Sequence, residues 1–294
     1  HGVPEDFLKA TEGYTGAVAR FDTGKPGPTT AFRSDIDCVL VRETDNPEHL
    51  PNKLGFASER PGFMHACGHD GHTAVGLAVA HWLVMNKDRL CGRFILIFQP
   101  AEEGVRGARA MAASGLVDHV DYFLGGHVGG DAKLGEIAVM DGGFLASTKF
   151  DVSIEGTPAH AGNSPELGHS ALMAACAASL MIQGIPRNSH GETRVSVGKL
   201  EAGEGRNVIP AHAKLQMEVR GETMAVNQFM ADYVYDIFAG VDKAYRVKST
   251  VTKAGESETL MPCPEIYPVL EKVMAKIPGT KLLPRVHSGA GSED

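Results

Sequence analysis

The sequence has few of the features that mark secreted, membrane-spanning or nucleic-acid-binding proteins. Its five cysteines are irregularly spaced, which excludes a disulfide framework and indicates a reducing, cytoplasmic compartment. The longest apolar stretches, residues 94–98 and 170–185, are too short or too interrupted to cross a bilayer, and no signal peptide is expected at the start. Acidic residues outnumber basic ones by 36 to 28, so the net charge of −8 disfavours nucleic acids and anionic membranes as partners.

The sequence does contain ample material for a folded core. Hydrophobic residues make up 43% of the 294 positions, which excludes disorder over most of the length. The 35 glycines indicate many tight turns, and the 13 histidines are clustered rather than evenly spread. Because the chain begins without Met and ends after a short strand-like segment, we expect it to be part of a longer protein.

The first half of the chain alternates helical patterns with short apolar runs. Strands are expected at residues 14–21, 29–35, 93–99 and 122–127, the last two fully buried, and helices at 73–87 and 107–114. The polar, Pro- and Gly-punctuated stretch 46–63 predicts a loop. This alternation favours an α/β fold with a mainly parallel sheet.

The pattern changes near residue 148. Strand 149–155, helix 168–183, strands 193–200 and 213–220, helix 224–243 and strand 246–252 follow in the order of a ferredoxin-like sandwich. Residues 148–254 therefore predict an inserted α+β domain. Helix 267–276 then returns to the first domain, which would comprise residues 1–147 and 255–294 and be incomplete at both ends.

The strongest chemical signal is the segment His65 to Thr73, directly before a helix. It brings one thiol, one carboxylate and three imidazoles together with two glycines. Soft and borderline ligands at such close spacing suit a transition metal such as zinc or manganese. The alternative is a set of helix-capping and core residues, but the density of ligand types favours a metal site.

Two further signals follow strand ends. Glu102 and Glu103 come after strand 93–99, where one carboxylate could bind metal while the other acts as general base. The alternative is a solvated acidic pair that opens a helix. His127 stands at the end of strand 122–127 in a Gly-Gly-His sequence, and alone it would indicate a structural residue.

These residues resemble the co-catalytic metallo-aminoacylase and carboxypeptidase family, in the branch of hippurate hydrolase and the plant indoleacetyl-amino-acid hydrolases. The resemblance covers nearly the whole chain and includes residues 289–294. It depends on Arg33-Ser-Asp35-Ile-Asp37, His65 to Thr73, Phe98 to Gly104, Gly126-His127, Ala159 to Gly162, Gly205 to Pro210 and Glu218 to Gly221.

The resemblance implies a role for each matching residue around one or two divalent ions per subunit, zinc or manganese. Glu102 would be the general base that activates water. Asp35 and Asp37 would lie near the metal behind its ligands, where Asp37 would orient a ligand. Asp35 and Asp37 remain open to a second interpretation, as carboxylates of a strand-end turn. The implied metal ligands are Cys67, His69, Glu103 and His127.

In the inserted domain, the resemblance implies a lid that also forms a homodimer or heterodimer. His160 would polarise the scissile carbonyl in the partner subunit's site, and Asn207 and Arg220 would hold the substrate carboxylate. Arg220 could instead be a surface cation paired with a neighbouring Glu. The family has one more His ligand near its C-terminus, and His287 does not match its place, so we expect that ligand beyond the end of this chain.

The implied activity is metal-dependent hydrolysis of the amide bond of a small N-acyl or N-aroyl amino acid, with p-aminobenzoyl-glutamate as the first choice. The alternative within the enzyme class is a hippurate-type or other N-acyl-amino-acid hydrolase. A non-catalytic partner subunit is the alternative of another class, but such a subunit has no chemical need for Glu102.

Overall fold

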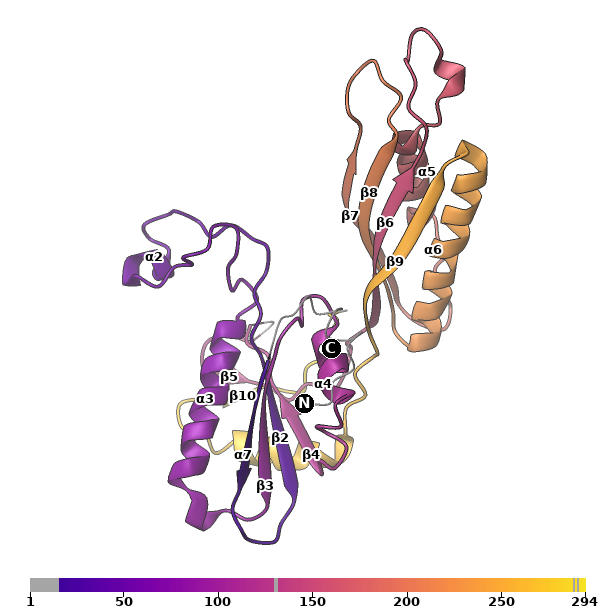
Figure 1. Ribbon diagram of the computed structural model, residues 1–294. Helices are drawn as coiled ribbons and strands as arrows, with labels where there is room; N and C mark the ends of the chain where they lie inside the picture. The colour runs from indigo at the N-terminus through magenta and orange to yellow at the C-terminus, as the bar shows by residue number, and fades with distance from the viewer. Residues whose placement is uncertain (1–15, 130–131, 288, 290) are drawn as a thin grey trace. The chain divides into compact units, whose positions relative to one another are not determined.

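A computed structural model describes residues 16–129, 132–287, 289 and 291–294. The chain separates into two compact units, residues 1–134 and 135–294 (Figure 1). The division expected from the sequence, with residues 255–294 returning to the first domain, stays a prediction. The first two residues of expected strand 14–21 lie outside the described residues.

The first unit is built on a four-stranded sheet of β1 (Ala17–Asp22), β2 (Thr29–Asp35), β3 (Arg93–Gln99) and β4 (Tyr122–Gly125). The strand order is β1-β3-β2-β4, with β2 parallel to β3 and to β4, and β1 antiparallel to β3. Strands β2 and β3 are central, and their apolar residues Ala31 and Ile97 are buried. The mainly parallel α/β architecture predicted from the sequence is therefore confirmed.

Two local predictions for this unit are wrong. Strand β4 is not buried: Tyr122 and Phe123 are 49% and 54% exposed, because within the described sheet β4 is an edge strand that pairs only with β2. The stretch expected to be a loop contains the short helix α2 (Leu50–Leu54). Pro51 lies in the first turn of α2, where its missing N–H has no helical partner to lose.

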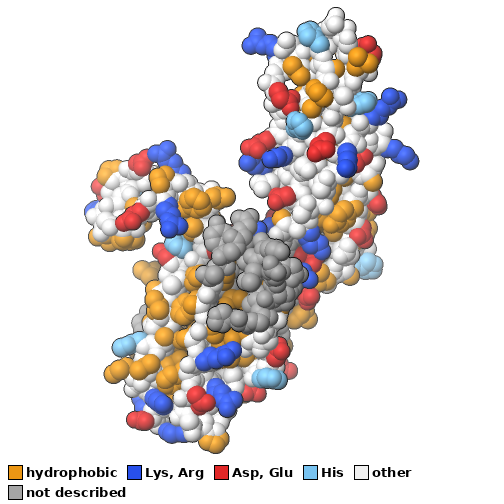
Figure 2. Space-filling view, in the orientation of Figure 1, with side chains coloured by type: hydrophobic (Ala, Val, Ile, Leu, Met, Phe, Trp, Pro, Cys, Tyr) orange, Lys and Arg blue, Asp and Glu red, His pale blue; other side chains and the backbone are white. Residues whose placement is uncertain are grey.

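The remaining helices of the first unit are α3 (His69–Met85), η1 (Lys87–Arg89) and α4 (Gly107–Ala112). Helix α3 begins four residues earlier than its apolar spacing indicates, directly after Gly68, whose φ of 90° suits glycine. His69 and His72 consequently lie one turn apart on the same side of α3. Helix α3 leaves Leu77, Trp82 and other apolar side chains exposed. Figure 2 shows hydrophobic side chains gathered on the surface of this unit.

The second unit contains a four-stranded antiparallel sheet with two helices. Its elements follow as β6 (Ala146–Glu155), α5 (Ala171–Gln183), β7 (Thr193–Ala202), β8 (His212–Gly221), α6 (Met224–Tyr245) and β9 (Lys248–Ser257). The strand order is β7-β8-β6-β9, the order of a ferredoxin-like sandwich. Phe150, Val152 and Ile154 alternate along β6 into a core shared with α6 residues such as Phe238.

The rest of the second unit consists of short elements. Strands β5 (Glu136–Ile137) and β10 (Lys281–Leu282) pair in parallel, and α7 (Tyr267–Met274) covers most of the helix predicted there. Single 3-10 turns form η2 (Pro165–Leu167) and η3 (Pro264–Ile266). Across the described parts of both units, each helix is too short or too polar to cross a membrane.

Candidate metal-hydrolase site

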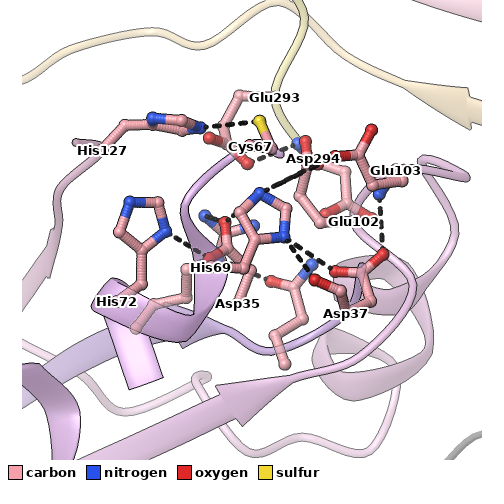
Figure 3. Close-up of polar contacts among 12 residues, drawn as sticks. Asp35, Asp37, Cys67, His69, His72, Glu102, Glu103, His127, Glu293 and Asp294 are labelled. Carbon is pink, nitrogen blue, oxygen red and sulfur yellow. Dashed lines mark hydrogen bonds and ion pairs between the residues drawn. The ribbon is translucent and has the colours of Figure 1, made fainter. Parts of the chain in front are cut away.

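The candidate site lies at one edge of the first unit's sheet. Parallel strands β2, β3 and β4 end at this edge, which is where open α/β sheets bind ligands. The side chains point toward one another from the strand ends and from the start of α3 (Figure 3). They include the ligands and the base that the sequence predicts: Asp35, Asp37, Cys67, His69, Glu102, Glu103 and His127.

The thiol and two imidazoles form the first part of this cluster. The Cys67 sulfur lies 3.4 Å from Nε2 of His127. One ligand atom from each of Cys67, His69 and His127 lies within 4.8 Å of the others, a spacing that suits a shared metal ion. His65 and Asp70, from the same motif, belong to none of the potential ligand groups among the described residues.

The ring of His69 connects this group with the carboxylates. Its Nδ1 lies 3.0 Å from the carbonyl oxygen of Asp37 and 3.2 Å from the Asp37 carboxylate, so Nδ1 carries the proton and donates it. Nε2 then lies 3.6 Å from Asp35 Oδ2. It also lies 3.9 Å from an oxygen of Glu102 and 3.9 Å from an oxygen of Glu103.

Asp37 supports two of the predicted ligands at once. One of its carboxylate oxygens faces His69, and the other accepts the backbone N–H of Glu103 at 3.0 Å. Burial alone would raise the pKa of Asp37, but the hydrogen bonds from His69 and Glu103 outweigh burial and lower it. Asp37 is therefore an ionised carboxylate whose hydrogen bonds connect α3 with the segment after β3.

The Glu102–Glu103 pair lies in a strained turn and not at the start of a helix. Helix α4 begins only at Gly107, and Glu102 is just 7% exposed, so neither part of the solvated helix-opening alternative holds. Ala101 and Val105, on either side of the pair, have φ values of 57° and 48°. A non-glycine residue in this region costs about 1–3 kcal/mol, which is typical of functional turns.

Burial and the carboxylates determine which protons the site holds. Burial, with the charges of Glu103 and Glu102, raises the pKa of the Cys67 thiol to about 12. For His69, burial lowers the pKa, but the hydrogen bond to Asp37 and the charge of Asp35 outweigh it and raise the pKa to about 9. At neutral pH the cluster therefore retains protons that a divalent cation would displace.

The donor set fits a divalent transition metal. Nε2 of His69 is buried and has no hydrogen-bond partner among the residues that the structure describes. A buried polar nitrogen without a partner costs free energy unless it binds something. Sulfur, imidazole nitrogen and carboxylate oxygen are the ligand types that zinc and manganese accept.

Sequence reasoning missed three buried residues behind the cluster. Asp35 is fully buried, with Arg33 Nη1 at 3.0 Å from one carboxylate oxygen and His72 Nδ1 against the other. Arg33 in turn donates from Nε to Gln99 at 2.8 Å. Arg33 lies two residues before Asp35 and so on the same face of β2, which is the signal that could have linked them. For His72 the signal is its place in the dense motif, one helical turn after His69, whereas no such signal exists for Gln99.

In the second unit, His160 and Asn207 lie close together. Residues 160 and 208 form a β-bridge, and Ala161 N–H donates to the Asn207 carbonyl at 3.0 Å. Nδ1 of His160 accepts the backbone N–H groups of Gly162 and Asn163 at 3.2 and 3.1 Å. The proton of a neutral His160 must therefore be on Nε2, which makes this exposed ring a hydrogen-bond donor.

The structure does not bring Asn207 and Arg220 together. Asn207 precedes the first residue of β8, whereas Arg220 is the last residue but one of that strand. At 3.3 Å per residue, β8 alone spans roughly 26 Å from His212 to Arg220, and Asn207 comes five residues before His212. Arg220 forms an ion pair with Glu218 at 2.9 Å, the alternative considered from the sequence.

A family model described as Peptidase family M20/M25/M40 matches residues 31–294. The chain belongs to this family. A homologue of one component of p-aminobenzoyl-glutamate hydrolase, from Haemophilus influenzae, is 47% identical, over 100% of this chain and 70% of that protein. An indole-3-acetyl-aspartic acid hydrolase from Enterobacter agglomerans is 45% identical, over 100% of this chain and 68% of that protein.

Solved structures of M20 relatives agree with this assignment. An aminobenzoyl-glutamate utilization protein from Klebsiella pneumoniae has a TM-score of 0.78 and 38% identity, over 100% of this chain and 72% of that one. A dinuclear metal-binding M20 peptidase from Bacillus subtilis has a TM-score of 0.65 and 25% identity, over 98% and 76%. The family resemblance seen in the sequence is thereby confirmed.

Proposed function

We propose that this M20 protein is a metal-dependent amidohydrolase that cleaves p-aminobenzoyl-glutamate into p-aminobenzoate and glutamate. The observation that carries the proposal is the convergence of Cys67, His69 and His127 on the buried Glu102 and the half-buried Glu103. The relatives support the substrate class, because p-aminobenzoyl-glutamate and indole-3-acetyl-aspartate both join an aromatic acyl group to an acidic amino acid.

Four residues of the first unit would hold the metal. One or two ions, zinc or manganese, would be bound, and the dinuclear relative supports two. Once bound, a divalent ion acts as a Lewis acid and lowers the pKa of water. We assign the ligand role to Cys67, His69, Glu103 and His127.

Glu102 is the proposed general base. Its burial keeps its carboxylate away from bulk solvent, and its Oε2 atom lies 3.9 Å from His69 Nε2. Glu102 takes a proton from the attacking water and returns it to the leaving amine as the C–N bond breaks. Asp37 keeps the His69 ring in the tautomer that this arrangement requires, and Asp35 contributes charge behind it.

The lid residues would act on the substrate across a dimer. His160 offers a proton on Nε2 to the carbonyl oxygen, in the partner subunit's site by family resemblance. Asn207 and Arg220 are too far apart on one chain to hold one carboxylate, so both can bind the same substrate only if two chains supply them. We therefore propose a homodimer or heterodimer formed through the lid, residues 148–254.

Two parts of the proposal have alternatives. Indole-3-acetyl-aspartate is the second substrate candidate, because its hydrolase is nearly as similar as the aminobenzoyl-glutamate relative; hippurate-type substrates come next. A non-catalytic partner subunit is the other class. We place the reaction in the cytoplasm, which the five free cysteines support.

A substrate panel tests the proposal. Metal-stripped full-length protein would be supplied with zinc or manganese and assayed on p-aminobenzoyl-glutamate, indole-3-acetyl-aspartate and hippurate. We expect metal-dependent release of p-aminobenzoate, with the highest kcat/KM on the first substrate. Failure to hydrolyse any of the three with either metal would refute an amidohydrolase role, and preference for another substrate would refute the assigned one.

A further inference from the structure

We infer that His72 is a positioning residue that fixes the ring of His127 through the backbone of Val128; the inference rests on the proposed role of His127 as a metal ligand. His72 belongs to the dense motif before α3, but none of the assigned roles uses it. It is 5% exposed and lies on the first turn of α3.

The hydrogen bonds of His72 determine where its proton lies. Val128 N–H donates to Nε2 of His72 at 2.8 Å, so Nε2 must be the unprotonated nitrogen. The proton of the neutral ring is therefore on Nδ1, where it is donated to the Asp35 carboxylate. Because both ring nitrogens are used, His72 is not available as a metal ligand, although it lies beside Asp35 and His69.

The carbonyl group of Val128, in the next peptide group along the chain, fixes His127. Nδ1 of His127 donates to the Val128 carbonyl oxygen at 2.7 Å, which leaves the lone pair on Nε2, 3.4 Å from the Cys67 sulfur. The two imidazole rings also pack edge to face, with centroids 4.6 Å apart. His72 and His127 thus bind the N–H and the C=O of the same residue, Val128, which belong to successive peptide groups.

His127 needs this support because its own segment gives it little. The ring is exposed, lies two residues beyond the end of β4, and has glycines at positions 126 and 129. The Val128 side chain is held as well, because a Cβ on Gly68 would lie 2.4 Å from it. Arg33 forms an ion pair with the other oxygen of Asp35. The series of contacts that leads through Asp35 and His72 to His127 therefore begins in the buried interior of the sheet.

Two variants of equal length separate positioning from packing. Gln at position 72 offers an oxygen near the place of Nε2, whereas Met fills similar space without an acceptor; both lose the donor to Asp35. In metal-free full-length protein we expect nitrogen NMR to show His127 in the Nδ1–H tautomer for wild type and for His72→Gln. For His72→Met we expect a mixture of tautomers.

Zinc affinity, measured by chelator competition, gives a second readout. Loss of a residue that orients a metal ligand lowers affinity by about 10–100-fold, which we expect for His72→Met, with His72→Gln within a few-fold of wild type. Equal losses in the two variants, or an unchanged His127 tautomer in His72→Met, would overturn the inference.

Wild-type protein alone provides a test that does not depend on the variants folding. His72 must be the Nδ1–H tautomer. A proton on Nε2 instead would refute the proposed hydrogen-bonded connection from His72 to His127. These readouts are independent of catalysis, because the tautomers are measured without metal or substrate. A wild-type protein that binds zinc but hydrolyses no amide would remove the proposed function and leave the assignment of His72 standing.

Discussion

The affinity of the site for its first metal ion should rise steeply with pH. The pKa values of the His69 imidazole and the Cys67 thiol are raised to about 9 and about 12. At pH 7, His69 is therefore the doubly protonated imidazolium and Cys67 is the thiol. A metal ligand must be the neutral imidazole or the thiolate, so binding displaces one proton from each. Two protons released per ion correspond to an affinity increase of roughly 100-fold per pH unit.

The same two pKa values determine the direction of the change in metal affinity with pH and the pH range in which it occurs. A raised pKa extends the protonated form to higher pH, so affinity increases with pH throughout the range from 7 to 8.5. Above about 9, His69 is already neutral, and the dependence should fall to roughly tenfold per unit, since only Cys67 still releases a proton.

Calorimetry in buffers of different ionisation enthalpy counts the released protons, and chelator competition at several pH values measures the slope. Cys67→Ser is the matched control, because a serine hydroxyl has no proton to lose in this range; we expect about one proton per ion instead of two. A wild-type affinity that stays constant between pH 7 and 8.5, or a release that Cys67→Ser leaves unchanged, would refute this account of the site.

Three further predictions concern individual residues. Glu102→Gln should retain its metal content but lower kcat by roughly 10²–10⁴-fold, and near-normal turnover would remove Glu102 from the mechanism. Arg220→Ala should lower kcat/KM by roughly 10–150-fold for an acid substrate and far less for its carboxamide, whereas equal losses would leave Arg220 only its ion pair. Gly68→Ala should reduce the free energy of unfolding by about 1–3 kcal/mol, because φ is 90° there and the new Cβ would meet Val128. Gly71→Ala, on α3 with open space around its Cβ position, is the control and should be neutral or slightly stabilising in denaturant titrations.

The sequence was sufficient to predict the site where chemistry depends on residue type and strand order. Cys67 and His69 stand out by ligand density, and the apolar run of β3 places Glu102 and Glu103 at the sheet edge where His127 also lies. Parallel strands end together, so residues distant in sequence could be assigned to one place without coordinates.

What the sequence could not provide depends on contacts through the backbone. The link from His72 to His127 passes through the backbone N–H and C=O of Val128, and every residue type except proline offers the same two groups there. The left-handed conformations of Ala101 and Val105 are also invisible, because local preference opposes them and only the surrounding fold maintains them. For α2, the prolines and polar residues of the stretch predict a loop, although Pro51 is well placed in the first turn of a helix.

The length of β8 has a consequence for inheritance and engineering. If Asn207 and Arg220 must come from two chains to hold one substrate, each active site is built from both chains, and a substitution in one chain can impair its neighbour's site instead of its own. Two inactive variants can then complement each other in a mixed dimer. A Glu102→Gln chain still contributes an intact lid, and a His160→Ala chain still contributes an intact general base. Mixed dimers of the two contain one site in which every group is intact, so co-expression should restore part of the activity that neither chain has alone.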